Sequence, residues 1–421
     1  MHSWRNGKLR RERGPGMDVG PLREGASMAE EPSGGHPVYL DYNATAPLRP
    51  EALEATFAAL RSVGNASSAH RAGQEASTRV DLARRQLAAL LHCSPSEIIF
   101  TSGATEANNL ALRAAYTRGG ALVTTAVEHP AVLEIARALT QDTPDALVIL
   151  PVDAEGVVDL AKLDEALEDL AGRGVALVSV MLANNETGVL TDLRPIVKAA
   201  HAAGALVHTD ATQYVGRLPL DLEALHVDLL SLSAHKFGGP QGVGALFLRR
   251  GASLPYHPLL VGGGQERGWR AGTLNVAGIA GLGAAAEASR LKIQEEAVRV
   301  AALRDDLEAG LLARVPGFRI NGANVPRLPG VTSITFPGLP ADAVLAAMPH
   351  VAASEGSACS SGAPSPSHVL LAMGRSRDDA DSTVRFSLGY ATTPRDIACG
   401  IEAVTAAVTH VRSLIAFDTV R

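Results

Sequence analysis

Cysteine is scarce in this chain of 421 residues, which contains only Cys93, Cys359 and Cys399. Three cysteines so far apart cannot form a disulfide framework, and none lies in the C-x-x-C pair that often holds zinc. We therefore expect no disulfide scaffold and no bound metal. The low cysteine content also favours a reducing compartment, so we predict a cytoplasmic protein.

Long apolar runs and clusters of one charge are also missing. No run approaches the ~20 apolar residues that span a bilayer, so we expect no membrane partner. The net charge is −6 at pH 7, and no Lys/Arg stripe with interleaved aromatic residues is present, so we expect no nucleic acid partner. Hydrophobic residues make up 46% of the chain and charged residues 19%, as in globular proteins. The length predicts two or three compact units.

The first 36 residues differ from the rest. Their early part is basic and has no apolar core of the kind that a secretory signal needs; its charged residues are Arg5, Lys8, Arg10, Arg11, Glu12 and Arg13. We interpret residues 1–36 as a disordered leader or an over-long start, because Met17 and Met28 could each begin the chain. A mitochondrial-type transit peptide is the alternative, weakened by the acidic residues that follow Glu12.

Short β-rich runs alternate with amphipathic stretches between residues 96 and 250. The predicted strands are Ile98–Phe100, Ala121–Thr125, Ala146–Leu150, Val175–Leu182, Ala205–Thr209, Asp228–Ser233 and Gly244–Leu248. Apolar residues three and four apart predict helices at Ala131–Leu139, Leu160–Leu170 and Leu193–Ala203. This alternation predicts an α/β fold with a mostly parallel sheet covered by helices. Only a short Gly-Gly-Pro-Gln-Gly turn precedes Gly244–Leu248, so this last strand could run antiparallel.

A second, smaller α/β unit is predicted after a long helix at Ala284–Leu312. Its predicted elements are strands at Ser333–Phe336, Val351–Ser354 and Thr383–Leu388 and a closing helix at Arg395–Ile415. We therefore divide the chain into a leader (1–36), an N-terminal segment (37–50), a large domain (51–288) and a small C-terminal domain (289–421).

Two motifs place an aspartate and a lysine close together in the sequence. H-T-D-A-T-Q (His208 to Gln213) begins at the end of one predicted strand, and S-A-H-K-F-G-G-P (Ser233 to Pro240) begins at the end of the next. Pyridoxal 5'-phosphate needs a lysine amine to hold its aldehyde as a Schiff base and a carboxylate to keep its ring nitrogen protonated. Lys236 and Asp210 are the candidates, although an isolated pair of this kind is more often structural.

With these motifs the chain resembles the cysteine desulfurases of the NifS-like branch, in the class V aminotransferase group of fold type I pyridoxal phosphate enzymes. The resemblance runs from about Val38 to about Val411. It implies a large domain with a seven-stranded sheet, and a small domain that also includes the segment Val38–Pro50. It further implies a homodimer with shared active sites.

A phosphate site is predicted where T-S-G-A-T-E-A-N-N (Thr101 to Asn109) passes from a strand into a helix. Unpaired N–H groups and the helix dipole suit a phosphate there, although a simple helix cap has the same pattern. The resemblance assigns this role to Ala104, through its backbone, and to Thr105. The remaining residues that the resemblance assigns to the phosphate are Ser233, His235 and, from the neighbouring subunit, Thr273. The usual S-G-H-K of the family here reads S-A-H-K.

The resemblance implies three further contacts with the cofactor. His129, in V-E-H-P, matches the histidine that stacks on the pyridine ring, and an imidazole also moves protons near neutral pH. Asn185, in A-N-N-E-T-G, and Gln213 match the groups that hydrogen-bond the phenolic oxygen. All three follow predicted strands, where the ligand crevice of an open α/β sheet lies. Turn chemistry is the alternative for Asn185 and Gln213.

Cys359 lies in S-E-G-S-A-C-S-S-G-A-P-S-P-S, a run of small and turn-forming residues. A nucleophilic thiol must be reachable, and such a run provides access. Cys359 matches the persulfide-forming cysteine of the family. Glu355 stands where a small residue is usual, and its carboxylate could raise the thiol pKa. Cys93 and Cys399 lie in helical, apolar stretches and are interpreted as packing residues.

Arg385, in V-R-F-S-L-G, interrupts a predicted strand with a guanidinium. A bidentate clamp on a substrate carboxylate explains it, and an internal salt bridge explains it equally well on the pattern alone. The resemblance favours the clamp and adds Asn185 to the substrate contacts.

These residues together predict a cysteine desulfurase that converts L-cysteine to L-alanine. The resemblance implies that Lys236 and His129 move protons, and that Cys359 takes the sulfur as a persulfide. The persulfide then passes to a sulfur acceptor or iron–sulfur scaffold protein. A selenocysteine lyase on the same fold and a non-catalytic binding protein with a vestigial site are the alternatives. The presence of Lys236, Asp210, Cys359 and Arg385 together argues against the non-catalytic one.

Overall fold

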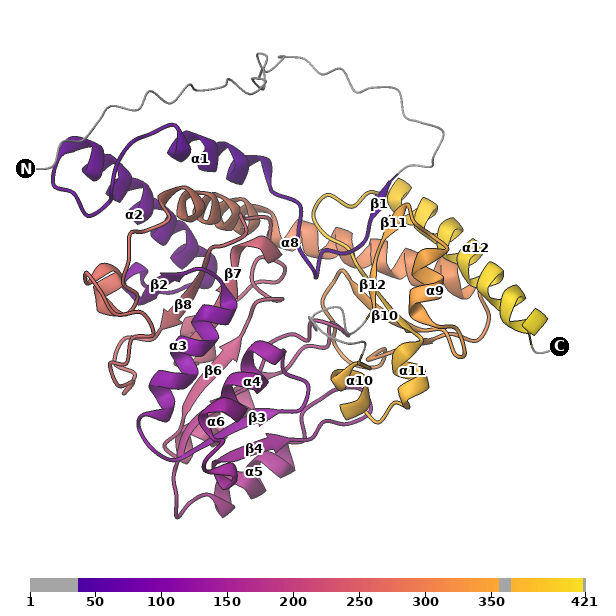
Figure 1. Cartoon of the computed structure of the whole chain (residues 1–421), viewed down its shortest axis with the longest axis horizontal. Helices are drawn as coiled ribbons and strands as arrows, with labels where there is room; N and C mark the ends of the chain where they lie inside the picture. The colour runs from indigo at the N-terminus through magenta and orange to yellow at the C-terminus, as the bar shows by residue number, and fades with distance from the viewer. Residues whose placement is uncertain (1–36, 356–364, 419–421) are drawn as a thin grey trace, which may run out of the picture. The chain divides into compact units, whose positions relative to one another are not determined.

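The computed structural model describes residues 37–355 and 365–418. Cys359 and residues 1–36 lie outside this part of the chain, so the predictions for them are not addressed by the structure. Figure 1 shows two sets of strands with helices around them, joined by one long helix, α8 (Val276–Leu312).

Seven strands of the described residues form the larger sheet, in the order β2-β8-β7-β6-β5-β3-β4 (Figure 1). They are β2 (Ile98–Thr101), β3 (Ala121–Thr125), β4 (Leu147–Leu150), β5 (Val175–Ser179), β6 (Leu206–Asp210), β7 (Leu229–Ser233) and β8 (Gly244–Leu248). Neighbours pair in parallel except that β8 runs antiparallel to both β7 and β2. The predicted α/β class and the antiparallel direction of Gly244–Leu248 are confirmed.

Both faces of this sheet are buried, which explains the uninterrupted apolar runs of its strands. In β2, Ile98 and Phe100 belong to one hydrophobic core, and Ile99 between them belongs to another. The first core also contains side chains of α2, α5, α6 and α8, and the second contains side chains of α3 and α4. Helices therefore cover both faces, as the alternating pattern predicts.

The helices around the larger sheet are α1 (Pro50–Leu60), α2 (Arg71–Leu91), α3 (Ala104–Tyr116), α4 (Pro130–Leu139), α5 (Leu160–Asp169), α6 (Leu193–Ala202) and the short α7 (Leu222–Leu225). Helix α8 begins at Val276, well before the predicted start at Ala284. Asn275 caps it by accepting a hydrogen bond from the Gly278 N–H at 3.0 Å. The predicted start was wrong because glycines interrupt the apolar pattern of the first turns, and packing against α1 and α2 overrides their low helix propensity.

The second set of strands forms a four-stranded sheet in the order β12-β13-β10-β9 and a β1-β11 pair. The strands are β1 (Val38–Tyr39), β9 (Arg319–Ile320), β10 (Val331–Thr335), β11 (Val351–Ala352), β12 (Ser354–Glu355) and β13 (Thr383–Ser387). The helices are α9 (Ala341–Ala346), α10 (His368–Ala372), α11 (Arg377–Asp381) and α12 (Pro394–Asp418). The parallel pair of β1 with β11 joins the N-terminal segment to this region. The domain boundaries themselves remain a prediction.

Helix α12 is long and apolar enough to cross a membrane by length and composition, over Pro394–Phe417. Its apolar character has a simpler source, because Ile401, Val404 and Val408 belong to the buried core beneath the four-stranded sheet. Buried helices of globular proteins often have this length and composition.

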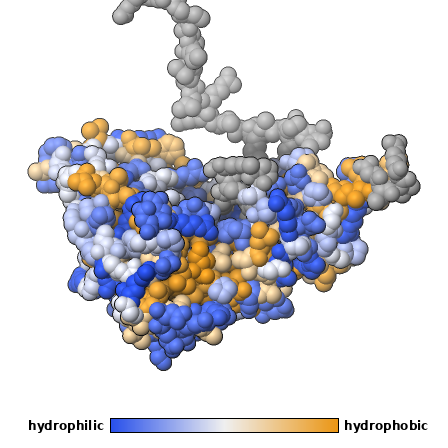
Figure 2. All heavy atoms as spheres, turned by 60° about the horizontal axis from the view of Figure 1, so that its bottom comes forward, coloured by the Kyte–Doolittle hydropathy of each residue, from blue (hydrophilic) through white to orange (hydrophobic). Residues whose placement is uncertain are grey.

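Figure 2 shows hydrophilic residues over much of the face that it displays, with hydrophobic residues gathered near its middle.

Candidate active site

A cavity of about 410 Å³ lies where strands of the larger sheet end. Thr101, Ser179, Asp210 and Ser233 are the last residues of β2, β5, β6 and β7, and open α/β sheets bind ligands beyond this carboxyl edge. The predicted site residues that line the cavity are Ala104, Thr105, His129, Asn185, Asp210, Gln213, Ser233, His235 and Lys236. Residues up to 132 positions apart in the sequence are thus brought to one place.

One end of the cavity is formed by the N-terminus of α3. Gly103 precedes the helix and supplies no side-chain cap, so the capping alternative does not account for this turn. The first N–H groups of a helix have no acceptor within it, which leaves those of Ala104 and Thr105 for a ligand. The turn packs closely on β8, since a Cβ on Gly244 would lie only 2.7 Å from the Gly103 Cα. The arrangement suits an anion such as phosphate.

Asp210 lies at the end of β6, where it is 6% exposed. Its Oδ2 accepts a hydrogen bond from Asn108 Nδ2 at 2.8 Å, and its Oδ1 accepts one from the Thr212 N–H at 2.9 Å. These donors fix the carboxylate at the cavity wall. Asn108 was missed by the sequence analysis, because its contact is with a residue 102 positions away.

Lys236 lies at the same edge of the sheet, just after the neighbouring parallel strand β7. Its Nζ donates to the main-chain oxygens of Asn43, at 2.5 Å, and Ala44, at 2.9 Å. His235 beside it is hydrogen-bonded through Nδ1 to Thr45 Oγ1 at 3.2 Å. Burial, together with the charges of Lys236 and Arg217, lowers the pKa of His235 to about 4. This histidine is therefore neutral at physiological pH.

His129 precedes α4 and caps it, because its Nδ1 accepts the Ala131 N–H at 3.0 Å. An acceptor at Nδ1 places the proton of the neutral ring on Nε2. Burial lowers the pKa of His129, to which the charges of Lys236 and His368 add, although Asp210 acts in the opposite direction. The neighbouring Glu128 is fully buried, and burial raises its pKa to about 8. Glu128 was not predicted, since nothing in its local sequence indicates that it is buried.

Asn185 and Gln213 line the cavity with buried side-chain oxygens that have no hydrogen-bond partner among the described residues. Gln213 instead uses its Nε2 to donate to the main-chain oxygen of Asn43 at 3.1 Å. Buried unpaired acceptors cost free energy, so they indicate a ligand with a donor group. Pyridoxal phosphate fits this arrangement of donors and acceptors. Its phosphate matches the N–H groups at the α3 N-terminus, its ring nitrogen matches the Asp210 carboxylate, and its phenol matches the unpaired amide oxygens.

Arg385 is 1% exposed in the middle of β13. Its Nη2 pairs with Asp41 Oδ1 at 2.9 Å, and its Nη1 donates to the main-chain oxygen of Asn185 at 3.0 Å. The internal salt bridge is therefore present, and Arg385 reaches the described cavity lining only through Asn185. Its Nε has no partner among the described residues. The role as a carboxylate clamp remains a prediction.

The structure does not bring Thr273 into the described cavity lining, and its side chain is exposed on the segment that leads to α8. Cys359 lies outside the described residues. Of the other cysteines, Cys93 is half-buried, and burial raises its pKa to about 12, as suits a packing residue. Within the described part of the chain, no group of His, Cys, Asp and Glu side chains is arranged to hold a metal ion.

A second missed carboxyl lies beside the cavity. Glu186, next to Asn185, is 3% exposed and accepts a hydrogen bond from Ser367 Oγ. Burial raises its pKa to about 7, although the hydrogen bond acts in the opposite direction. Because Ser367 also caps α10, Glu186 ties the start of that helix to the wall of the cavity.

Comparisons with known proteins show which family the chain resembles over most of its length. The family model described as Aminotransferase class-V matches residues 38–399. The chain is 42% identical over 384 residues to the cysteine desulfurase IscS of Anaeromyxobacter dehalogenans, covering 90% of this chain and 94% of the relative. It is 45% identical over 397 residues to a cysteine desulfurase of a Frankia strain, covering 90% and 92%. A NifS-like protein of Rickettsia africae has a similar structure, with a TM-score of 0.81, 35% identity and coverage of 88% and 99%.

Proposed function

We propose the following residue roles for this chain, which belongs to the aminotransferase class-V family and is a pyridoxal phosphate-dependent cysteine desulfurase acting on L-cysteine. The observation that supports them is the meeting of Lys236, Asp210, His129 and the α3 N-terminus around one cavity. No residue indicates selenocysteine over cysteine, so the selenocysteine lyase alternative has no support of its own.

Each part of the cofactor has a proposed partner. The N–H groups of Ala104 and Thr105, with Ser233 and His235, hold the phosphate. The carboxylate of Asp210 holds the proton of the ring nitrogen, and Lys236 carries the aldehyde carbon. His129 covers the ring, while Asn185 and Gln213 bind its phenolic oxygen. When bound, pyridoxal phosphate supplies an electron sink for the pair of electrons released at the substrate Cα.

Two groups move protons in this proposal. Lys236 Nζ takes the proton from the substrate Cα, because it is the amine that the substrate displaces and it stays beside the reacting carbon. His129 is neutral, with its transferable proton on Nε2, which suits proton movement near neutral pH. Arg385 and Asn185 orient the substrate carboxylate.

The sulfur chemistry is assigned to Cys359. Its thiolate attacks the sulfur of L-cysteine, so that an S–S bond forms while the substrate Cβ–S bond breaks. The electron pair of the broken bond remains with the carbon skeleton, which leaves as L-alanine after protonation. Cys359 then carries a persulfide, which it passes to a sulfur acceptor or iron–sulfur scaffold protein.

A homodimer with shared active sites completes the proposal. The exposed position of Thr273 outside its own chain's cavity supports a role in the cavity of a second copy. We assign the protein to the cytoplasm.

The test is an absorption spectrum of the purified protein with pyridoxal phosphate, before and after addition of L-cysteine, with alanine and sulfide assayed in the same sample. We expect a cofactor band that shifts on addition of L-cysteine and alanine that forms in step. Cys359→Ser should keep the band and lose sulfide release, whereas Cys399→Ser, in a half-buried helical position, should retain both. A protein that shows no band with added cofactor would refute the proposed residue roles.

A further inference from the structure

The N-terminal segment from Asn43 to Arg49 lies along residues 235–238 and is hydrogen-bonded to each of these four residues. The main-chain contacts are Ala46 N–H to His235 oxygen at 2.8 Å and Arg49 N–H to Gly238 oxygen at 2.9 Å. Lys236 itself donates from Nζ to the oxygens of Asn43 and Ala44. The segment is therefore a fixed neighbour of the lysine.

Asn43, in this segment, is 1% exposed. Its N–H donates to Ser387 Oγ at 2.9 Å, and its Nδ2 donates to the main-chain oxygen of Asn185 at 2.9 Å. Its Oδ1 accepts from Arg217 Nη1, and its main-chain oxygen accepts from Lys236 and Gln213. Every polar atom of Asn43 has a partner. The direction of its main-chain oxygen is consequently held by contacts on all sides.

Arg217 secures the same arrangement from the lysine side. Its Nη2 donates to the main-chain oxygens of Tyr42, at 3.0 Å, and of Lys236, at 3.3 Å. The guanidinium thus joins the backbone of the lysine to the segment that receives the lysine's amine. The oxygens of Asn43, Tyr42 and Lys236 that accept its hydrogen bonds are neutral, and burial lowers the pKa of Arg217 to about 10.

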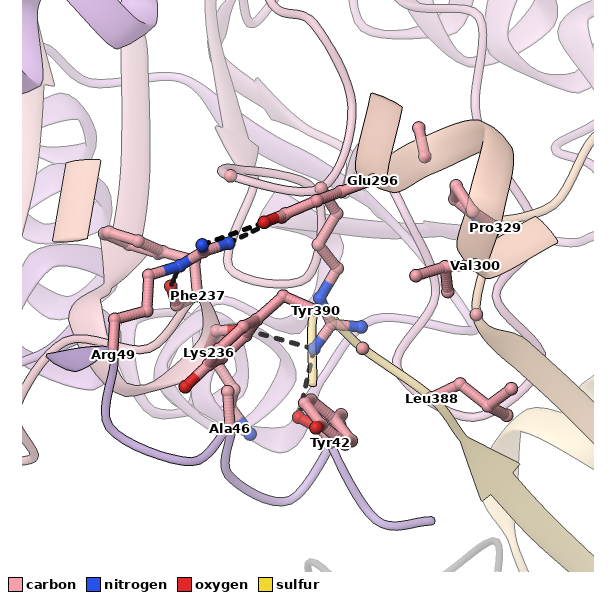
Figure 3. Close-up of a pocket in the computed structure, with 15 residues that line it drawn as sticks. Tyr42, Ala46, Arg49, Lys236, Phe237, Glu296, Val300, Pro329, Leu388 and Tyr390 are labelled. Atoms are coloured by element: carbon pink, nitrogen blue, oxygen red, sulfur yellow. Dashed lines mark hydrogen bonds and ion pairs between the residues drawn. The ribbon is translucent and has the colours of Figure 1, made fainter. Parts of the chain in front are cut away.

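Arg49 fixes the far end of the segment. It forms an ion pair with Glu296 of α8 at 2.6 Å, and its Nε donates to the Phe237 oxygen at 3.1 Å. Figure 3 shows these contacts around a small cavity of about 40 Å³, on which Lys236 and Tyr390 also border. The Arg49 guanidinium lies 4.2 Å from the centre of the Tyr390 ring. The Arg49 end of the segment is therefore anchored by residues outside the lining of the cofactor cavity.

We propose that Asn43 is a positioning residue, which holds its own main-chain oxygen and that of Ala44 as the docking place of the Lys236 amine once the substrate has displaced it. This inference rests on the proposed role of Lys236 as the cofactor lysine. Two aligned oxygens accept hydrogen bonds from the N–H groups of the released neutral amine and keep it beside the reacting carbon. The docking place favours the substrate-bound form over the form in which the lysine carries the cofactor.

The experiment measures this exchange without turnover, by titrating the holoenzyme with the product L-alanine and following the cofactor absorption band. Asn43→Ala removes the contacts with Arg217 and Asn185 and frees the Asn43 oxygen to turn away. We expect the apparent dissociation constant for L-alanine to rise by up to roughly tenfold, the effect of one hydrogen bond, with cofactor content unchanged.

A second variant protects the test against misfolding. Arg217→Lys keeps a positive charge but cannot reach the oxygens of Asn43, Tyr42 and Lys236 together. It should weaken L-alanine binding in the same direction. Asn321→Ala is the matched control, because Asn321 is equally buried but donates to Ser333 and Thr335 in the smaller sheet. It should leave the titration unchanged.

The outcomes separate this inference from the proposed function. A wild-type protein that forms no cofactor band overturns the role of Lys236 itself. A wild-type protein that titrates normally, with folded Asn43→Ala and Arg217→Lys variants that bind L-alanine equally well, overturns only the role of Asn43. An equal weakening in Asn321→Ala would also overturn it, because the effect would then be a general loss of packing.

Discussion

The two sides of the cavity are built in different ways. On the side of the larger sheet, Asp210, Ser233 and Lys236 end or directly follow a strand, so the fold places them at the carboxyl edge. On the other side, the N-terminal segment and β13 meet through pairs such as Asp41–Arg385 and Asn43–Ser387, each 344 residues apart. In the proposed function, the first side carries the groups that react with the cofactor, and the second holds those groups and the substrate in place.

The largest effect is expected from Lys236→Ala on the first side. Without the amine neither the cofactor bond nor the proton transfer at Cα remains, so kcat/KM for L-cysteine should fall by at least about a thousandfold. The cofactor band should lose its lysine-bound form. Lys198→Ala, at an exposed position of α6, is the control and should behave as wild type. Substantial activity in Lys236→Ala would place the cofactor elsewhere.

Asp210→Asn tests the same side with a smaller change. It keeps the size of the side chain and removes the charge that holds the ring proton, so kcat should fall by roughly a hundredfold, as for loss of a fixed electrostatic group. KM should change little. Asp228→Asn is the matched control. Asp228 is also buried, but it precedes β7 and is hydrogen-bonded to the Val207 N–H and to His201, at the edge of the sheet away from the cavity. Equal kcat losses in the two variants would contradict the assignment.

Arg385→Lys tests the second side. A lysine cannot hold Asp41, the Asn185 oxygen and a substrate carboxylate together, so we expect KM for L-cysteine to rise about tenfold while kcat falls less. Steady-state kinetics with both variants then sharpen the comparison: Asp210→Asn should act mainly on kcat and Arg385→Lys mainly on KM. A reversed pattern would remove the distinction between the two sides.

The smallest expected effect is on the pH dependence of folding stability, through a histidine in the core of the larger sheet. His208 is fully buried between Ser179 and Ser231, and burial lowers its pKa to about 4. The unfolded chain takes up a proton below about pH 6.5, whereas the folded chain does so only near pH 4, so stability falls as the pH decreases across this window. The contribution is at most about 1.4 kcal/mol per pH unit.

His208→Gln should make the unfolding free energy less dependent on pH between 4 and 6.5, as measured by urea denaturation. His235, whose pKa is also lowered, remains in the variant and keeps part of the slope. His410→Gln, at an exposed position of α12, should leave the slope of the wild type. An unchanged slope in His208→Gln would show that His208 does not carry the effect.

Much of the larger sheet was predictable because its strands are short apolar runs bounded by turn residues. The predicted strand Gly244–Leu248 is confirmed to the residue, and Ala205–Thr209 is displaced by one from the observed β6. The strand predicted at Val175–Leu182 was too long: β5 ends at Ser179, although the apolar run continues to Leu182. The buried residues that follow the end of β5 are as apolar as those of the strand, so the sequence does not show where the strand pairing stops.

The cavity residues were predictable where chemistry needs an unusual residue after a strand, as for Asp210 and Lys236. Glu128, Glu186 and Asn108 were missed, because a buried carboxyl or amide cannot be told from an exposed one without its surroundings. For Arg385 the sequence left two alternatives, and the structure contains the ion pair with Asp41. Arg385 can both pair with Asp41 and bind the substrate carboxylate only if its unpaired Nε or another of its N–H groups binds the substrate.

The sequence by itself determined the α/β class and the order of the strands along the chain, since both depend on local composition and periodicity. Its motifs, through their resemblance to a known family, indicated the residues of a pyridoxal phosphate site. Tertiary structure alone decided that Asn43 receives the Lys236 amine and that Arg217 links the two backbones. Those contacts join segments 174 and 193 residues apart. Their energy depends on distance and burial in three dimensions, which no local pattern in the chain records.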